Sequence, residues 1–471
     1  MEKVFKLSKN GTNVKTEIMA GLTTFFTMAY ILMVNSTMFS DPFGNGKNVL
    51  GVSYGAIYIA TAISAIVGTL LIGFLSNLPL AQASGMGLNA FFVYTVCIGL
   101  GMTYSNALVL VLIDGVTFVI LTVTGLRKVI FEAIPEPVRV SIPAGIGLFI
   151  AFLGLQNSKI VIPDTSTGVT LGSFNMLGSA KWSSVMPMIV TIVTVIAIAV
   201  MSKKNIKGSV LWGIFGGSAL YYLLGCSVPG FYKDFTSGMS FSPIAAFRDF
   251  GKFSFGKVFT QGFDFSAFAA KNGTANLVLA IITTSLAFCM VDMFDTMGTL
   301  YGACARGNML TKDGKVPNMN RAMLADAIAT CTGSVCGTST VTTYVESSAG
   351  VAEGGRTGLT SCVVAAMFLV SMFLSPVAQL IPGCATAAAL IYVGVLMMAC
   401  VKEIDWHSID IAVPAFLTIA MMPFTYNISY GISFGLFSYV VINLFTGKVK
   451  KIQAGTWVIA ILFMAMLFLT H

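Results

Sequence analysis

Apolar residues recur in runs along most of the chain. The length typical of these runs, roughly 17–25 residues, is what an α-helix needs to cross the hydrocarbon core of a bilayer. None of the runs shows the strict alternation of a barrel strand. They predict helical spans at 17–38, 54–76, 80–100, 105–126, 138–155, 184–202, 206–226, 276–298, 321–336, 338–352, 358–380, 385–401, 411–426 and 429–446, and one further apolar run at 454–470.

Composition supports the same class. Of 471 residues, 56% are hydrophobic and 10% are charged, and the mean hydropathy is +0.86. A soluble domain carries about 25% charged residues, so this chain has too few to cover its surface in water. The sequence therefore predicts an all-α polytopic membrane protein.

Charge placement predicts the orientation. If the N-terminus lies in the cytoplasm, the predicted inner segments hold nineteen of the 27 Lys and Arg residues, and five of the other eight lie in the long 227–275 loop. Short inner loops are basic in membrane proteins, whereas long loops cross largely regardless of charge. The first run has no signal-peptide cleavage pattern. We expect a multi-pass protein of the cell (plasma or inner) membrane, embedded in the lipid bilayer, and its net charge of +8 requires no nucleic-acid partner.

The sequence offers few residues that could bind a metal ion or a cofactor. The nine cysteines are scattered, and the closest pair, Cys331 and Cys336, is spaced too widely for a Cys-x-x-Cys motif. Histidine occurs only at His407 and His471. We expect no metal site, no cofactor and no enzyme activity.

The predicted spans form two sets of seven, separated by the 227–275 loop. Asn205-Ile206 opens the seventh span and Asn427-Ile428 opens the fourteenth, each followed by spaced glycines. Because seven is odd, the second set enters the membrane from the opposite side. Many secondary transporters consist of such inverted repeats, with the substrate site between them near the midplane.

The third and tenth spans are poor helices by propensity. Residues 82–90 contain two glycines, and residues 337–350 contain a run of β-branched and hydroxyl residues that favours extended backbone. Non-helical backbone at this depth persists where protein buries it or where it lines a cavity. Interrupted spans at matching positions of two halves indicate a transporter's site, although glycine and threonine also ease helix packing.

Carboxylates lie in or beside these spans. Asp292 and Asp295 share one face of the eighth span, and Glu346 lies in the tenth. A charge at the bilayer centre costs roughly 2.5–3.5 kcal/mol and is usually functional, and burial without a cation favours the protonated form. The alternative is that hydroxyl groups satisfy these acids and that they only link helices. For Asp114, alone in the fourth span, both interpretations stay open, and Glu353 with Arg356 is predicted to form an interfacial charge pair.

These residues resemble the nucleobase–cation symporters of the azaguanine-type hypoxanthine/guanine/adenine permease branch. The resemblance covers nearly the whole chain. It rests on the segments AGLTTFFTMAYI at 20–31, GMGLNAFF at 85–92, FDTMGTL at 294–300, GTSTVTTYVESSAG at 337–350, TGLT at 357–360 and VPAFLT at 413–418.

The resemblance implies a fourteen-span architecture of 7+7 inverted repeats, with short extended segments in spans 3 and 10. It implies a core domain at 17–126 and 276–380, a gate domain at 138–226 and 385–446, an extracytoplasmic loop at 227–275, and an extra segment at 454–470.

The resemblance also implies the site. Asn89, Asp292 and Glu346 would bind a purine base, with Gly87 and Thr340 beside them. Asp295 and Glu346 would couple its import to a proton, with sodium as the other possible ion. The preferred purine stays open, and so does the oligomeric state, with a homodimer as one option.

The sequence departs from the family pattern at two places, and two other classes of protein are alternatives. Relatives often have Ala-Pro where this chain has Ala83-Ser84, and the fourteen-span plan ends near Gly447, before the 454–470 run. An anion transporter of the same architecture would be opposed by three buried acids. A prenyltransferase-like enzyme would need more acids and cations than the lone Asp292/Asp295 pair.

Overall fold

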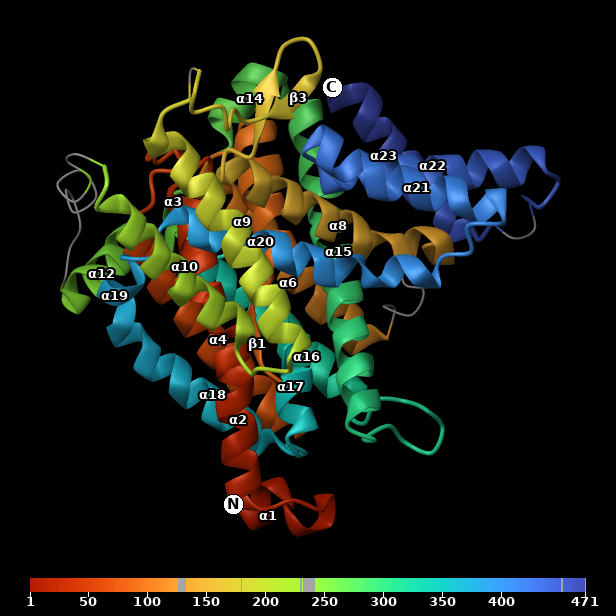
Figure 1. Cartoon of the computed structure of the whole chain (residues 1–471). Helices are drawn as coiled ribbons and strands as arrows, with labels where there is room; N and C mark the ends of the chain where they lie inside the picture. The colour runs from red at the N-terminus through yellow and green to blue at the C-terminus, as the bar shows by residue number, and fades with distance from the viewer. Residues whose placement is uncertain (126–132, 179, 229–230, 232–241, 450–451, 471) are drawn as a thin grey trace.

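The computed structural model describes residues 1–125, 133–178, 180–228, 231, 242–449 and 452–470. Several basic residues of the orientation argument, Arg127, Lys128, Lys450 and Lys451, lie outside the described residues, as does His471. Helices form most of the rest of the chain (Figure 1).

The long helices coincide with the predicted runs. Most of them begin and end within about four residues of the run that predicted them, and α15 extends further at its C-terminal end. They are α2 (Val14–Met28) with α3 (Tyr30–Ser40), α4 (Tyr54–Ser76), α6 (Tyr104–Thr124), α8 (Glu136–Asn157), α9 (Trp182–Lys203), α10 (Ser209–Gly225), α15 (Thr274–Arg306), α16 (Met319–Cys336), α18 (Gly358–Ser371), α20 (Gly383–Met397), α21 (Ile409–Thr425), α22 (Ile428–Phe445) and α23 (Ala454–Thr470).

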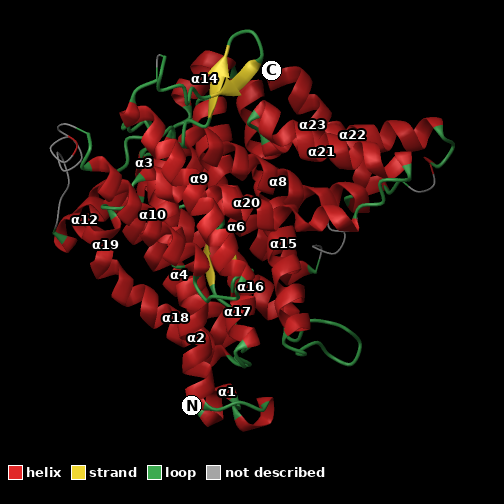
Figure 2. Ribbon diagram, in the orientation of Figure 1, coloured by secondary structure: helices red, strands yellow, loops and turns green. Residues whose placement is uncertain are grey.

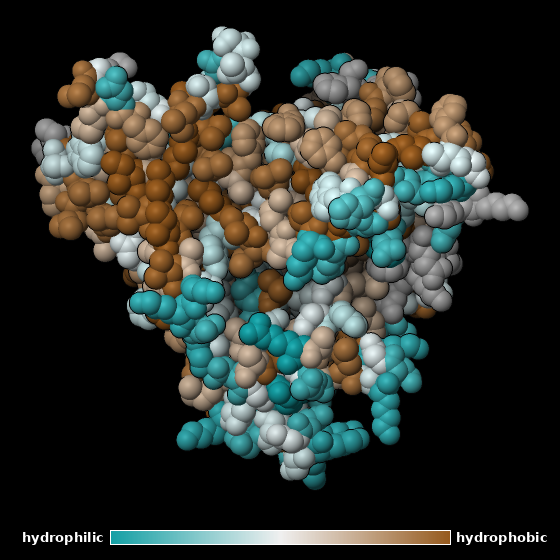
Figure 3. Space-filling model, turned by 45° about the vertical axis from the view of Figure 1, so that its right-hand side comes forward, coloured by the Kyte–Doolittle hydropathy of each residue, from teal (hydrophilic) through white to brown (hydrophobic). Residues whose placement is uncertain are grey.

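Within the described residues, nine continuous helical stretches have the length and apolar composition needed to cross a membrane. Shorter apolar helices include α10, α21 and the stretch Met86–Gly99. Hydrophobic residues cover much of the upper part of the molecular surface, and hydrophilic residues gather at the end where the N-terminus lies (Figures 1 and 3). The class of polytopic helical membrane protein follows from these helices and this surface.

The third and tenth spans are broken by short strands. β1 (Gln82–Ser84) and β4 (Val341–Thr343) pair antiparallel, with Gln82 opposite Thr343 and Ser84 opposite Val341. The prediction of extended segments is confirmed, and Figure 2 shows a strand at the centre of the helices. The ladder pairs only the facing edge of each strand. On the outer edges, the Thr69 hydroxyl donates to the Gln82 carbonyl and the Thr330 hydroxyl to the Val341 carbonyl, both at 3.0 Å.

Each strand leads into a helical segment. β1 is followed by α5 (Met86–Ala90), which continues as a π-helix (Phe91–Gly99), and β4 is followed by α17 (Ser347–Ala352). The tenth span therefore contains only one short helix instead of a continuous one.

The helices pack in two groups. α4 contacts α16 and α18, α16 contacts α6, and α18 contacts α2; β1 also packs on α4. In the other group, α8 contacts α20 and α21, α21 contacts α22, and α9 contacts α10 and α20. α23 packs on α22 and α15, and the Thr456 hydroxyl donates to the Ala133 carbonyl at 2.6 Å.

Two connecting regions contain elements that hydropathy did not indicate. Between α8 and α9, β2 (Val161–Asp164) and β3 (Gly168–Leu171) form a hairpin, seen at the top of Figure 1. The described part of the 227–275 loop contains α12 (Pro243–Asp249), a π-helical turn (Phe250–Ser254), α13 (Lys257–Thr260) and α14 (Ser266–Asn272).

The predicted Glu353–Arg356 charge pair is wrong. Glu353 pairs with Lys207 at 2.6 Å. The Arg356 guanidinium instead donates to the carbonyls of Val351 and Gly355, at 2.6 and 2.7 Å. Backbone carbonyls at the end of α17 are nearby acceptors for a guanidinium, so Arg356 satisfies its donors without a carboxylate.

Candidate functional site

The strand pair brings the third and tenth spans into direct contact. Beyond the strands, the Gly85 N–H donates to the Thr340 carbonyl at 3.0 Å. The Tyr344 hydroxyl donates to the Ser84 carbonyl at 2.6 Å. A Cβ on Gly85 would lie 2.7 Å from the Thr342 Cγ2 atom, so glycine is needed where the two segments approach most closely.

Asn89 joins the two segments through its side chain. It is fully buried, and its Oδ1 accepts hydrogen bonds from the hydroxyls of Ser84, at 2.7 Å, and Ser339. Its Nδ2 has one long bond, 3.4 Å, to the Ser84 carbonyl. Because an amide nitrogen carries two donors, Asn89 keeps donor capacity for a ligand.

Glu346 and Asp295 form a half-buried pair of acids. The Tyr30 hydroxyl of α3 donates to Glu346 Oε1 at 2.5 Å. Glu346 interacts electrostatically with Asp295 of α15. Neither acid takes part in an ion pair within the described part of the chain. This pair can therefore hold a proton or accept a donor from a ligand.

Asp292, one helical turn before Asp295 on α15, accepts a hydrogen bond from a residue of α16. Its Oδ2 accepts from the Thr330 hydroxyl at 3.2 Å, and its Oδ1 has no partner. It is fully buried, and its electrostatic neighbours include Asp326 and Asp114. The structure thus places Asp292 among buried acids, and its contact with a base stays a prediction.

Asp114 has a partner from the tenth span. The Thr340 hydroxyl donates to Asp114 Oδ2 at 3.2 Å, and both residues are fully buried. Asp114 Oδ1 has no partner. The side chain of Thr340 is therefore engaged with Asp114, and a contact between Thr340 and a base would require its backbone or a rearrangement.

Gly87 packs against the other group of helices. A Cβ on this residue would lie 2.4 Å from the Ile146 Cγ2 atom of α8. The glycine lets α5 approach α8 closely, and this contact lies between the two helix groups. A direct contact of Gly87 with substrate stays a prediction.

Asp326 of α16 is the residue that the sequence analysis missed. Its Oδ1 accepts from the Gln82 amide at 2.8 Å and from the Thr343 hydroxyl at 3.3 Å, and its Oδ2 accepts from the Thr296 hydroxyl at 2.8 Å. Thr296 also bonds to Thr342 at 2.7 Å. One fully buried carboxylate thus joins β1, β4 and α15.

A signal for Asp326 was present in the sequence. The residue stands between Ala325 and Ala327 in a predicted span, with no cation within one helical turn. An unpaired acid at such a depth is costly and is usually retained for function or for a specific hydrogen-bond network.

The described residues contain no group of three His, Cys, Asp or Glu side chains arranged to hold a metal ion. The acids are held by hydroxyl and amide donors from neighbouring segments. Such an arrangement offers hydrogen-bond donors and acceptors to a polar ligand. The fold and site define a multi-pass membrane transporter.

Comparison with known protein families identifies the family of this chain. A family model with the description "Permease family" (Xan_ur_permease) matches residues 15–434. The chain belongs to this permease family.

Relatives of known name are similar over nearly the whole chain. The guanine/hypoxanthine permease PbuO of Bacillus subtilis is 38% identical, covering 99% of this chain and 100% of its own. The adenine permease AdeP of Escherichia coli is 35% identical, covering 98% of this chain and 95% of its own. The resemblance stated from the sequence is confirmed, and these relatives are transporters rather than enzymes.

Solved structures support the fold. The transmembrane domain of a cyanobacterial bicarbonate transporter, BicA, has a TM-score of 0.58 at 13% identity, covering 91% of this chain and 97% of its own. The murine Slc26a9 anion transporter in the inward-facing state has a TM-score of 0.61 at 13% identity, covering 92% of this chain and 68% of its own. At this identity the likeness concerns the fold alone.

Proposed function

We propose that this protein imports purine nucleobases, namely adenine, guanine or hypoxanthine, by proton symport. The observation that carries the proposal is the arrangement around the strand pair: Asn89 retains donor capacity, and Asp295 and Glu346 lie together without a cation. A purine edge offers donors and acceptors side by side, which an amide and a carboxylate can bind as a pair.

In this proposal Asn89 and Glu346 bind the base and Asp295 carries the coupling proton. Asp292 would act from the buried side, with Gly87 and Thr340 shaping the segments. Tyr30, which donates to Glu346, would orient that carboxylate. A proton is favoured over sodium because Glu346 accepts a hydrogen bond from the Tyr30 hydroxyl, which satisfies the carboxylate without a metal ion.

The proposed architecture has fourteen spans in two inverted repeats. The protein would lie in the cell (plasma or inner) membrane with its N-terminus in the cytoplasm. The group around the strand pair would be the core domain, and the group of α8–α10 and α20–α22 the gate domain. Two separately packed groups are what alternating access requires, because one must move against the other. The names of the relatives support the substrate class.

Uptake by whole cells tests this function. Cells expressing the chain should accumulate labelled hypoxanthine, adenine or guanine, and an excess of unlabelled purine should compete, whereas uracil and sulfate should not. A protonophore should abolish uphill accumulation. Uptake that survives the protonophore but requires sodium would contradict the coupling, and absence of any purine uptake would contradict the substrate.

Asp295→Asn tests the coupling residue. We expect loss of net uphill transport while exchange across the membrane persists, because a neutral amide can still contact a ligand but carries no exchangeable acid proton. Wild-type accumulation by this variant would remove Asp295 from the coupling role.

The second candidate is anion transport, which is the function that the names of the fold neighbours give for those proteins. The buried acids oppose it, since Asp114, Asp292 and Asp326 are fully buried and any of them that ionises would repel an anion. Sulfate and bicarbonate uptake assays distinguish the two functions.

A further inference from the structure

A cavity of about 640 Å³ lies at one end of the helices, away from the strand pair. We call it the outer cavity. Its walls come from the ends of α3 and α8, the starts of α9 and α20, and the β2–β3 hairpin, and include Asp41, Asn157, Lys159, Lys181, Ser184 and Gly383. A volume of roughly 300–1,000 Å³ is typical of a small-molecule site.

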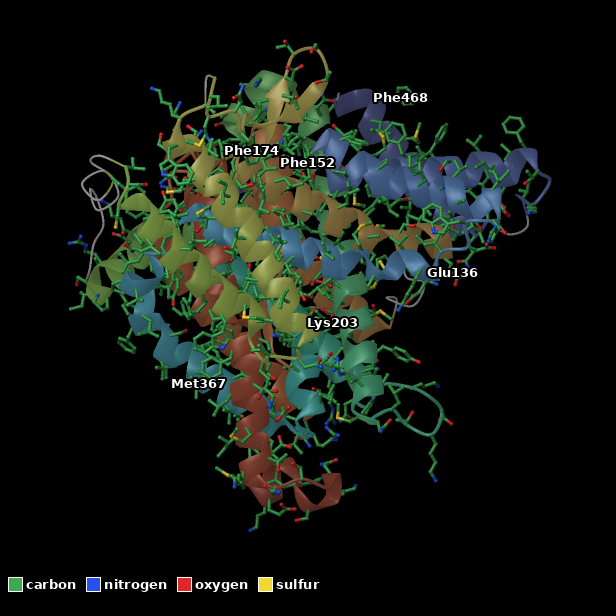
Figure 4. All side chains as sticks on the ribbon, in the orientation of Figure 1. Glu136, Phe152, Phe174, Lys203, Met367 and Phe468 are labelled. Carbon is green, nitrogen blue, oxygen red and sulfur yellow. The ribbon has the colours of Figure 1, made fainter. Side chains whose placement is uncertain are left out.

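The position of the outer cavity follows from α9. Figure 4 shows Phe174, just before this helix, towards the top of the molecule and Lys203, at its end, well below. Lys203 belongs to the loop predicted to lie in the cytoplasm. The cavity at the start of α9 therefore faces the exterior in the proposed orientation.

A narrow extension continues from the outer cavity. We call it the neck. It shares Asp41, Gly44, Asn157 and Gly383 with the outer cavity. Deeper, it lies between two helices, with Val34, Thr37 and Met38 on α3 and Thr386 and Leu390 on α20. The neck encloses about 10 Å³, close to the minimum for one water molecule.

One face of α3 connects the neck with the site. Tyr30, Val34, Thr37 and Asp41 are separated by four, three and four positions, the spacing of a single helix face. Asp41 borders the outer cavity, and the Tyr30 hydroxyl bonds to Glu346. At 1.5 Å per residue these ends are roughly 16 Å apart along the helix.

The two walls of the neck belong to different helix groups. α3 packs on α4, whereas α20 packs on α8 and α9. Widening the neck thus requires displacement of one group relative to the other. In the present arrangement the passage admits a water molecule but no planar base.

The polar residues of the outer cavity carry both signs of charge. Asp41, Lys159 and Lys181 all line the cavity, together with Asn157 and several serines. A cavity of one sign would select an ion, whereas this mixture offers donors and acceptors to an uncharged polar heterocycle.

We propose that the outer cavity is an external subsite for the uncharged base, and that Val34, Thr37 and Met38 of α3 with Thr386 and Leu390 of α20 form the outer gate through which the base reaches Glu346. This proposal rests on the proposed function for the identity of the base. The route itself rests on the cavity, the neck and the shared face of α3.

Cysteine labelling tests the route. In a Cys226→Ala/Cys384→Ala parent of the full chain, Thr37→Cys should react from outside with a membrane-impermeant methanethiosulfonate reagent whenever the two helix groups separate and the neck widens. Ser36→Cys is the matched control, because Ser36 is fully buried and is not part of the neck or the outer cavity. We expect reaction at position 37, slower when hypoxanthine or adenine is present, and no reaction at position 36.

A bulky residue tests the gate. Leu390→Trp should reduce uptake by about tenfold or more, because the extra volume has no space in the closed neck and obstructs it when open. Val395→Trp on the same helix, at a position that is 59% exposed, should leave uptake near the parent level. Immunoblots of the membrane fraction establish that both variants are inserted.

Equal labelling at positions 36 and 37, or parent-level uptake by an inserted Leu390→Trp, would overturn the route. If Leu390→Trp is not inserted, the labelling comparison decides. Labelling does not require uptake, so its outcome is separate from the proposed function. If the parent shows no purine uptake but position 37 is labelled selectively, the proposed function is contradicted and the proposed route is still supported.

Discussion

The side-chain amide of Gln82 donates to the carboxylate of Asp326 at 2.8 Å, joining residues 244 positions apart. Gln82 belongs to β1, and Asp326 also accepts from Thr343 of β4. The strand pair is therefore attached to α16 through one buried carboxyl group. Because Thr296 is the third donor and follows Asp295 directly, the same carboxylate positions the helix that carries the proposed coupling acid.

Asp326→Asn is expected to lower the maximum uptake rate by about tenfold or more while the protein still inserts. The variant places an amide N–H₂ against donors, and a buried donor left without an acceptor costs roughly 1–3 kcal/mol. Initial rates of purine uptake, normalised to membrane protein, measure the effect. Asp313→Asn, in an exposed turn, is the control. Unchanged kinetics for Asp326→Asn would remove its positioning role.

Gly87→Ala is expected to impair transport because the added methyl group would lie 2.4 Å from Ile146 Cγ2. Overpacking of this kind costs about 1–3 kcal/mol. Adding Ile146→Ala should restore uptake, since it removes the clashing atom. Gly302→Ala serves as control, because nothing lies within 4 Å of a Cβ there. A defect that Ile146→Ala does not relieve would favour direct substrate contact at Gly87.

Tyr30→Phe is expected to raise the KM for the base more than it lowers the maximum rate. The variant removes the hydroxyl that donates to Glu346 at 2.5 Å, so the carboxylate loses its fixed orientation. The loss corresponds to roughly 1.5–3 kcal/mol. Concentration-dependent uptake measures it, with Tyr301→Phe, which is 54% exposed, for comparison. A change confined to the maximum rate would assign Tyr30 to a conformational step.

The Lys207–Glu353 pair is expected to contribute little stability. Its side chains are 53% and 31% exposed, and surface ion pairs are worth about 0–1 kcal/mol. Lys207→Ala should therefore leave the thermal unfolding temperature of the detergent-solubilised protein nearly unchanged. The charge-swapped Lys207→Glu/Glu353→Lys variant provides the matched comparison. A large destabilisation by Lys207→Ala alone would mean that this pair joins the helix groups more strongly than its exposure implies.

Hydropathy was sufficient to predict where the helices lie. The thickness of a bilayer determines the length of each apolar run, so residues 54–76 could be read as a span and form α4 over the same range. Local propensity also predicted that 82–90 and 337–350 would be poor helices, and the strands at 82–84 and 341–343 lie within these segments.

Contacts between distant segments could not be predicted in the same way. The packing of separate helices determines the register of the two strands. It also determines that Thr340 donates to Asp114 and that Glu353 pairs with Lys207 instead of Arg356. Asp326 was overlooked because its span was judged by its apolar residues alone. Its hydrogen bonds to β1, β4 and α15 exist only in the folded structure.

The pairing of β1 with β4 has a consequence for biosynthesis. Gln82 and Thr343 are 261 positions apart, so at about 5–20 residues per second the ribosome needs roughly 13–50 s to supply the second strand after the first. During that interval the backbone of β1 has no strand to pair with, although a bilayer offers no substitute. The strand pair is therefore completed only after the second half of the chain has been synthesised.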